Sequence, residues 1–401
     1  MRIVIGVTSS VSIYKVLNVI RGLIKRGNEV KVVMSHNATK LISPLLFQTI
    51  SQNKVYVDNF NNDDPLIHIT LAKWGDVFVV VPATANIIGK IANGIADDLV
   101  STIALAFPYS KKRMIVPAMN KEMWINPINQ KNITKLKEYN WDIVEPEEGL
   151  FASPLEGKGK GRLPNEKTIV YSILRKNNGI LKDKKVIVTA GATKEYIDNV
   201  RFISNDSSGL MGLSLALVSY LEGADVCLIY GEMKYTPPKF IKSIKVVSTH
   251  DMLEQVEKEF INSDILLMPA AVSDFKPSKK FSGKLSKDQL LEIKLEKTPD
   301  ILKEISKKKK RHQIVIGFAL TSNKAEEYAI AKMREKKLDF VVANQLELKD
   351  GKITFNPMGS RTNKVTIFSK DGSRVEFEGS KLKVARSIIE YISKNIETQS
   401  S

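Results

Sequence analysis

The 401-residue chain contains a single cysteine, Cys227. One thiol excludes an intramolecular disulfide framework and a cysteine-rich zinc site. The sequence also has no apolar run near the ~20 residues needed to span a bilayer. Its short apolar N-terminus, MRIVIGVTSS, runs into a helical pattern without a cleavage site, so we interpret it as a buried first strand. We therefore expect a cytoplasmic protein with no membrane partner.

Two common nucleotide-binding signatures are missing as well. The chain has neither a G-x-x-x-x-G-K-[ST] loop nor a G-x-G-x-x-G fingerprint. Without that fingerprint and its downstream acidic partner, a NAD-dependent dehydrogenase ranks low among the candidate functions.

Positive charge is in excess, with a formal net charge of +17. Lys and Arg alternate with Glu in many places, and the one dense run, SKKKKRH at 306–312, falls where a helix should end. Cations are favourable at that end of a helix, so we expect a solvated helix end and no nucleic-acid partner. The competing hypothesis is a basic nucleic-acid or scaffold protein that has lost its chemistry, which would be colourless and bind nucleic acid in a salt-sensitive way.

Buried strands and amphipathic helices alternate along two stretches of the chain, separated by a Gly- and Pro-rich segment at 146–164. Such alternation predicts right-handed crossovers and parallel sheets covered by helices on both faces. We therefore expect an α/β protein with two doubly wound domains: a flavodoxin/Rossmann-like domain at 1–178, with a flap at about 146–164, and a Rossmann-like domain at 179–401. The last expected elements are a strand pair, KITF and KVTIFSK, and a helix at about 380–395.

Polar residues follow three strands of the first domain. GVTSS opens a helix after the first strand, where backbone N–H groups favour an anion. PATAN and PAMNKEMW each place an asparagine, Asn86 and Asn120, after a strand. Either these amides meet a ligand at the carboxyl edge of the sheet, or they cap the helices that follow. His68 would serve as a general base only if it faces the same edge.

The second domain carries a long polar loop, GATKEYIDNVRFISNDSSGLMG, before its first helix. Hydroxyls, backbone donors and an arginine fork suit a triphosphate, and the loop supplies Arg201, Asn205, Ser207, Ser208 and Gly209. Further along, AAVSDF places Asp274 after a strand, where it could bind Mg²⁺ or a nucleotide. The loop GKLSKD, with Lys284 and Lys287, suits either a polyphosphate or solvent.

Taken in order, these motifs resemble the bifunctional flavoprotein family of coenzyme A biosynthesis, in which phosphopantothenoylcysteine decarboxylase is fused to phosphopantothenate–cysteine ligase. The resemblance covers essentially the whole chain, from GVTSSVSIYK, HITL, PATAN, GIADDL and PAMNKEMW to AAVSDF, KTPDIL and GFA. It implies a first domain that binds FMN without a covalent bond and decarboxylates its substrate. It assigns the flavin site to Gly6, Thr8, Ser10, Ser35, Thr84, Ala85 and Asn86. His68 matches the catalytic base and Asn120 the substrate-binding asparagine of the family.

The same resemblance implies that the second domain joins 4′-phosphopantothenate to cysteine through an acyl-nucleotide. Bacterial relatives use CTP and Mg²⁺, whereas eukaryotic stand-alone ligases use ATP. Asn205 matches the asparagine that handles the acyl-nucleotide, and the nucleotide-site positions are matched by Asp274, Phe318, Lys332 and Lys337. Relatives are homo-oligomers that reach dodecamers, so the resemblance also implies an oligomer.

Two departures from the family pattern concern the chemistry. In relatives the flap carries a cysteine that protonates the enethiol intermediate, but here the flap reads LFASPLEGKGKGR, with Ser153 or a neighbour at that place. A hydroxyl is a much weaker acid than a thiol, whose pKa is near ~8.5. Either another group donates the proton, or the first domain is an oxidative decarboxylase that stops at the enethiol. The ligase signature K-x-K-K is likewise changed, to Lys284-Leu-Ser286-Lys287.

Overall fold

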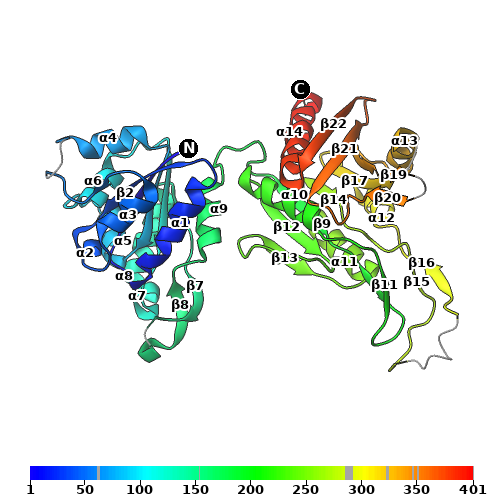
Figure 1. The fold of residues 1–401 in the computed structure, drawn as a ribbon, viewed down its shortest axis with the longest axis horizontal. Helices are drawn as coiled ribbons and strands as arrows, with labels where there is room; N and C mark the ends of the chain where they lie inside the picture. The colour runs from blue at the N-terminus through cyan, green and yellow to red at the C-terminus, as the bar shows by residue number, and fades with distance from the viewer. Residues whose placement is uncertain are drawn as a thin grey trace. The chain divides into compact units, whose positions relative to one another are not determined.

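The computed structural model describes residues 1–60, 64–152, 154–284, 292–321, 325–345, 347–349 and 352–400. The chain divides into two compact units, Met1–Leu174 and Arg175–Ser401. Each unit contains its own central sheet and its own buried core (Figure 1). The Rossmann-like α/β architecture predicted from the sequence is confirmed in both.

Unit 1 is built on a six-stranded parallel sheet with the order β3-β2-β1-β4-β5-β6. Its strands are β1 (Arg2–Val7), β2 (Glu29–Met34), β3 (Val55–Tyr56), β4 (Val77–Ala83), β5 (Lys112–Pro117) and β6 (Trp141–Ile143). Its helices are η1 (Val11–Ile13), α1 (Tyr14–Ile24), α2 (His36–Thr39), α3 (Pro44–Ser51), α4 (Ile67–Trp74), α5 (Ala85–Ala92), α6 (Leu99–Ala106), α7 (Lys121–Ile125), α8 (Pro127–Glu138) and α9 (Glu166–Leu174).

The two-residue period of the strands explains how this sheet is covered on both faces. In β1, Ile3 and Ile5 pack with α1, α3 and α9, whereas Val4 points to the opposite face and packs with α4, α5, α6 and α8. Because both faces are apolar, the strands are almost continuous hydrophobic runs. The carboxyl edge of the sheet is left for the polar loops GVTSS, PATAN and PAMN.

The flap forms an antiparallel hairpin of β7 (Glu147–Leu150) and β8 (Lys158–Arg162), with a short helix η2 (Pro154–Glu156) between the strands. The hairpin lies against the loop that follows β5: Met119 N donates to Gly161 O at 3.0 Å. Gly161 has φ +154°, and a Cβ there would lie 2.3 Å from Met119 O and against the Phe151 ring. Glycine therefore allows the flap to approach this loop closely.

Unit 2 contains an eight-stranded sheet with the order β13-β12-β9-β14-β17-β18-β21-β22, parallel up to β18 and antiparallel thereafter. The strands are β9 (Lys185–Ala190), β12 (Asp225–Tyr230), β13 (Lys242–Lys245), β14 (Ile265–Met268), β17 (Ile314–Thr321), β18 (Phe340–Gln345), β21 (Thr362–Ser369) and β22 (Arg374–Ser380). Small two-stranded sheets are formed by β10 (Lys194–Tyr196) with β11 (Phe202–Ser204), β15 (Phe275–Pro277) with β16 (Leu295–Lys297), and β19 (Glu347–Lys349) with β20 (Lys352–Phe355). The helices are α10 (Leu210–Leu221), α11 (Thr249–Phe260), α12 (Ile301–Lys308), α13 (Ala325–Glu335) and α14 (Lys381–Ser400).

Helices again cover both faces of this sheet. Buried residues of α11, α12 and α13 form one hydrophobic core with the strands. On the other face α10 packs against β9 and α14, so that α10 is buried on nearly all sides (Figure 1). Both KITF and KVTIFSK form strands, but the expectation that they pair with each other is wrong. KITF (β20) pairs with β19, whereas KVTIFSK belongs to β21, which lies between β18 and β22.

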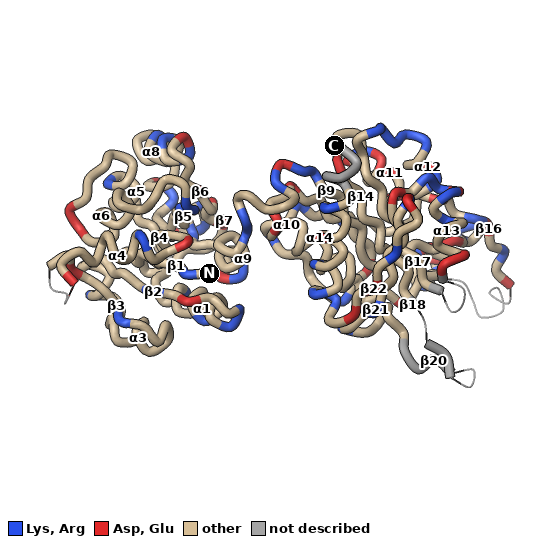
Figure 2. The backbone as a smooth tube through the Cα atoms, turned by 90° about the horizontal axis from the view of Figure 1, so that it is seen from above, with Lys and Arg blue, Asp and Glu red and all other residues tan. Residues whose placement is uncertain are grey.

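The basic run at 306–312 falls at the end of α12, as expected (Figure 2). Lysine ammonium groups of this run have partners within the chain. Lys307, Lys308 and Lys309 form ion pairs with Glu304, Glu257 and Asp339 at 2.5–2.7 Å. The run therefore stabilises its own unit. Within the described ranges, no helix combines the length and apolar character that crossing a membrane requires.

Candidate functional site

The first candidate site is the carboxyl edge of the unit 1 sheet, where Thr8 joins two predicted loops. Its Oγ1 donates to Pro82 O at 2.6 Å and accepts from Thr84 N at 3.2 Å. The side chain is 3% exposed. The Thr8 hydroxyl therefore holds the PATAN loop beside the GVTSS loop. Thr8 contributes to a ligand site by positioning these two loops, because its hydroxyl hydrogen is already donated to Pro82 O.

Gly6 also has a packing role. A Cβ at this position would lie 2.9 Å from Val100 Cγ1, so only glycine lets α6 pack this closely on β1. By contrast, Ser10 and Ser35 precede η1 and α2 without making a side-chain capping bond, and both are partly exposed. The Ser10 hydroxyl lies 3.0 Å from Ser12 Oγ, with which it shares a hydrogen bond, and both hydroxyls lie where an anion could reach them. These two hydroxyls, with small Ala85 at the start of α5, are compatible with a phosphate-bearing planar cofactor at this edge.

The two asparagines after the strands differ in their local role. Thr84, not Asn86, caps α5, accepting from Ile87 N at 3.5 Å, and Asn86 is exposed in the first turn of the helix. The capping interpretation is therefore wrong for Asn86. It is confirmed for Asn120, which accepts from Glu122 N at 2.7 Å at the start of α7.

Asn120 also contacts the flap: its Nδ2 donates to Glu156 Oε1 at 3.0 Å. The flap hairpin thus reaches the residue that the resemblance assigns to substrate binding. Ser153 lies outside the described residues. Cys227 is in β12 of unit 2, where burial raises the pKa of its thiol to about 11 and keeps it protonated.

His68 lies on α4 and is partly buried. No hydrogen bond of the described residues joins it to Asn86 or Asn120. Beside it in sequence, Asp64 accepts from Thr70 Oγ1 at 2.6 Å and Leu66 N at 2.8 Å, which lowers the pKa of that carboxyl. The structure therefore places His68 in the first turn of α4, where no hydrogen bond of the described residues links it to those two asparagines.

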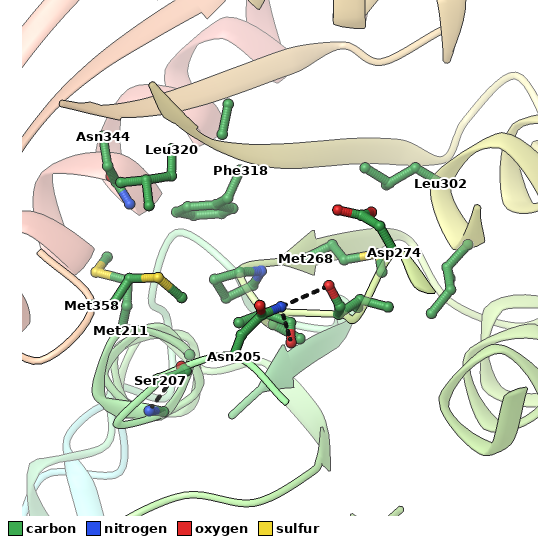
Figure 3. Close-up of a pocket in the computed structure, with 18 of the residues that line it drawn as sticks. Asn205, Ser207, Met211, Met268, Asp274, Leu302, Phe318, Leu320, Asn344 and Met358 are labelled. Carbon is green, nitrogen blue, oxygen red and sulfur yellow. Dashed lines mark hydrogen bonds between the residues drawn. The ribbon is translucent and has the colours of Figure 1, made fainter. Parts of the chain in front are cut away.

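The second candidate site is a cavity of about 600 Å³ in unit 2. It lies at the carboxyl ends of β14, β17 and β18, where doubly wound sheets bind ligands. Seven of the residues predicted for nucleotide or substrate binding line it: Asn205, Ser207, Ser208, Gly209, Asp274, Phe318 and Lys332. Figure 3 shows Phe318 and Asn205 on facing walls.

Asn205 is held by two backbone carbonyls. Its Nδ2 donates to Ala271 O at 3.3 Å and to Val272 O at 3.0 Å (Figure 3). This arrangement fixes the amide plane and leaves Oδ1 as the group that can meet a ligand. Nearby, the start of α10 is formed by Gly209 at φ +72°, with no side-chain cap on the helix. The backbone N–H groups of this turn are suited to a phosphate.

Charged residues gather at the wall made by α12 and α13. Lys332 Nζ donates to Phe318 O at 2.6 Å, and burial, with a smaller effect of Lys336, lowers the pKa of this ammonium to about 8. Lys336 Nζ lies 2.7 Å from Asp300 Oδ2. Burial opposes ionisation of Asp300, but the bonds from Lys336 and Lys303 N outweigh it and lower the pKa of its carboxyl.

Several predicted residues lie elsewhere. Lys337 does not line the cavity: it has φ +49° just beyond α13, and it is the preceding Lys336 that lines the wall. Arg201 faces buried Asp198 at 3.5 Å and is likewise absent from the lining, as is exposed Lys284. Lys287 lies outside the described residues. Within the described part of the chain, no three His, Cys, Asp or Glu side chains gather to hold a metal ion, so Asp274 has no protein-only metal site around it.

Sequence reasoning missed Lys336, Asn363 and Lys381 of the cavity wall. For Lys336 a signal was present, since residues four apart share a helix face and Lys332 was already a candidate. For Asn363 and Lys381 there was none, because they come from a strand and a helix start far along the chain.

Comparison with known proteins finds a separate family match for each half of the chain. Residues 1–178 match the family model described as Flavoprotein, and residues 181–396 match the DNA/pantothenate metabolism flavoprotein C-terminal domain. The chain is 38% identical over 396 residues to the coenzyme A biosynthesis bifunctional protein CoaBC of Borreliella burgdorferi, covering 97% of this chain and 98% of that one. It is 40% identical over 397 residues to the CoaBC of Bacillus subtilis, covering 97% and 96%. A cysteine/cysteine sulfinic acid decarboxylase from an unknown prokaryotic organism is 37% identical over 361 residues, covering 88% of this chain and 99% of that protein. The chain therefore belongs to the family of coenzyme A biosynthesis bifunctional proteins.

Proposed function

We propose that the chain ligates 4′-phosphopantothenate to cysteine and then decarboxylates the product, with residues 179–401 as the ligase domain and residues 1–178 as the FMN-binding decarboxylase domain. The observation that carries this proposal is the unit 2 cavity, where Asn205, the α10 start and Lys332 converge beside Asp274. The names of the two CoaBC relatives, matched over almost their whole length, support the pairing of the two activities. They do not favour the oxidative alternative.

In the ligase step, the chain's task is to hold a nucleotide and a carboxylate in line. The first turn of α10 and the Lys332 ammonium attract phosphates, and Asn205 Oδ1 or its neighbouring backbone orients the reacting group. We propose CTP in preference to ATP, following the bacterial relatives. Mg²⁺ would enter with the nucleotide, held by Asp274 and by phosphate oxygens, as is usual for an ion that keeps few protein ligands.

In the decarboxylase step, FMN supplies the redox chemistry that makes the substrate able to release CO₂. The chain holds that cofactor through Ser10, Ser35 and the α5 start, and Asn120 holds the substrate carboxylate under the flap. His68 acts as the base. The residues predicted for the flavin site fit this role in part, because Gly6 and Thr8 act through packing and loop fixation.

We further propose a cytoplasmic homo-oligomer, with a dodecamer as the form that the family suggests.

The experiment that tests the function supplies 4′-phosphopantothenate, cysteine, Mg²⁺ and either CTP or ATP, and identifies every product by mass. We expect a yellow protein that forms 4′-phosphopantetheine, CO₂, a nucleoside monophosphate and pyrophosphate. A product lacking two hydrogens would instead support the oxidative alternative. Release of CO₂ from free cysteine without phosphopantothenate would show an activity like that named for the third relative. Absence of both phosphopantothenoylcysteine and its decarboxylated products with either nucleotide would contradict the ligase assignment.

A further inference from the structure

Lys381 is a buried cation in the wall of the unit 2 cavity. It is the first residue of α14, and its side chain is 3% exposed. Its Nζ donates to Met358 O at 3.3 Å, and no acidic side chain of the described residues forms an ion pair with it. Burial lowers the pKa of this ammonium to about 8. An enclosed charge without a counter-charge is unfavourable, so this position favours an anion supplied from outside the chain.

Two helix starts add to the positive potential at the same place. Ser208 Oγ, just before α10, donates to Met358 O at 2.8 Å, so the Met358 carbonyl joins the starts of α10 and α14. α10 begins without a side-chain cap, and its first residues line the cavity. A cation at a helix N-terminus is itself disfavoured by the helix dipole. An anion would relieve this unfavourable arrangement, beside the hydroxyls of Ser207 and Ser208 that accept from Gly209 N and Leu210 N.

A third group at this end also lacks a partner. Asn363 is 2% exposed and lines the cavity, and its Oδ1 is buried without a hydrogen bond. Its Nδ2 donates to Asn344 Oδ1 at 3.3 Å. Because an amide oxygen only accepts, a water or cation that accompanies an anionic ligand would complete this position.

The charges at the other end of the cavity give the ligand a direction. There Asp274 and Asp300 offset much of the charge of Lys297, Lys332 and Lys336, whereas no acidic residue of the described lining is left to offset Lys381. In Figure 3, Asp274 and Leu302 lie well apart from Met211, Met358 and Asn344. A nucleotide would therefore place its terminal phosphates at the Lys381 end and its α-phosphate nearer Asp274 and Lys332.

We propose that Lys381 binds the β- and γ-phosphates of the nucleotide, the part that leaves as pyrophosphate. This assignment rests on the proposed ligase function and names a residue that binds the leaving pyrophosphate in that reaction. In that step a substrate carboxylate oxygen bonds to the α-phosphorus while the bond from this phosphorus to the bridging oxygen breaks. The electron pair of the broken bond remains on the pyrophosphate, whose charge the Lys381 ammonium compensates.

Calorimetric titration of the full chain tests this assignment. Inorganic pyrophosphate, CTP and CMP are titrated into the wild type, Lys381→Met and a control, Lys383→Met, which alters an exposed lysine on the same helix. Loss of one charge-assisted hydrogen bond should weaken binding of pyrophosphate and of CTP by about 10- to 100-fold. CMP, which lacks the β- and γ-phosphates, should bind the wild type and both variants equally.

Thermal unfolding without ligand separates this role from a structural one. Because Lys381 has no counter-charge in the described structure, Lys381→Met should unfold at or above the wild-type temperature. Equal pyrophosphate affinity in the wild type and Lys381→Met would overturn the proposal, as would a wild type that does not bind pyrophosphate. Failure of both Lys381→Met and Lys381→Gln to fold would also overturn the proposal, because the Lys381 charge would then be needed for folding.

The readout does not depend on ligation. If Lys381 is needed for pyrophosphate binding but no phosphopantothenoylcysteine forms with either nucleotide, the proposed function fails and the anion subsite stands. If the wild type ligates and Lys381→Met binds pyrophosphate normally, the subsite fails and the function stands.

Discussion

Lys332 and Lys381 give the unit 2 cavity a pH-dependent charge. Burial lowers the pKa of each ammonium to about 8. For Lys332, Lys336 acts in the same direction, whereas Asp300 and Asp274 oppose it. Below that pH both side chains are mostly charged and attract phosphates. Above it they lose their protons, while nucleotide phosphates stay ionised, so nucleotide affinity should fall as pH rises from about 7 to about 9, by up to about tenfold per pH unit for each lysine that must be protonated.

Titration of CTP across this pH range checks the prediction. Lys332→Met should bind more weakly at about pH 7 and show a shallower decline, because one of the two titrating groups is gone. Arg334→Met, which alters an exposed side chain on the same helix, is the control and should follow the wild type. A wild-type affinity that stays constant or rises toward about pH 9 would contradict the assigned roles of both lysines.

The interpretation of single residues depends on their position within one helical turn. Asn86 was a candidate cap, but Thr84 occupies the extended position that precedes α5, and Asn86 lies two residues inside the helix. Lys337 was a candidate nucleotide residue, but α13 ends at Glu335 and the chain turns at Lys337, which leaves Lys336 on the cavity wall. Motifs locate such residues to within a residue or two, and only the backbone geometry selects among neighbours.

At the scale of elements, the flap hairpin depends on Gly161. A Cβ at this residue would lie 2.3 Å from Met119 O, and alanine at φ +154° would be strained as well. Gly161→Ala should therefore move β8 away from the loop that carries Asn120. A displacement of about 1 Å in a catalytic site can reduce the rate on the order of 100-fold, and we expect a loss of that size in decarboxylation with ligation unchanged.

The matched control is Gly157→Ala in the same hairpin. Gly157 also has positive φ, +62°, but no atom lies within 4 Å of the added Cβ. Alanine can enter the left-handed region at φ +62° at modest cost and meets no collision there, so the decarboxylation rate of this variant should stay much closer to the wild type. Equal losses in the two variants would show that strain alone is responsible and that the contact with Met119 does not matter.

The strands of both central sheets were predictable where burial on both faces makes them continuous apolar runs, as in β4 and β14. The antiparallel end of the unit 2 sheet was not. β22 alternates Val375 and Phe377 with charged residues, which is a pattern typical of a strand, but this strand was not among those predicted. The pairing of β21 with β18 and β22 joins distant segments, and local pattern does not specify such partners.

At the scale of the whole molecule, each unit has its own sheet and core, so substitutions in the two sites should act independently. His68→Asn removes the proposed base from α4 and should abolish decarboxylation without affecting ligation. Asn205→Asp replaces the amide that donates to Ala271 O and Val272 O by a carboxylate that repels both carbonyls and any phosphate. It should abolish ligation and leave decarboxylation intact.

Two assays on the full-length variants measure this independence. Phosphopantothenoylcysteine is supplied directly for decarboxylation, and 4′-phosphopantothenate, cysteine and nucleotide are supplied for ligation, with the product identified by mass. Flavin absorbance and thermal unfolding confirm that each variant is folded and holds its cofactor. If one substitution removed both activities from folded, yellow protein, the sites would be coupled, and the assignment of one reaction to each unit would be wrong. If each substitution removes only its own reaction, the result supports ligation followed by decarboxylation. The Asn205→Asp variant should then decarboxylate phosphopantothenoylcysteine that is supplied to it, although it no longer makes this compound.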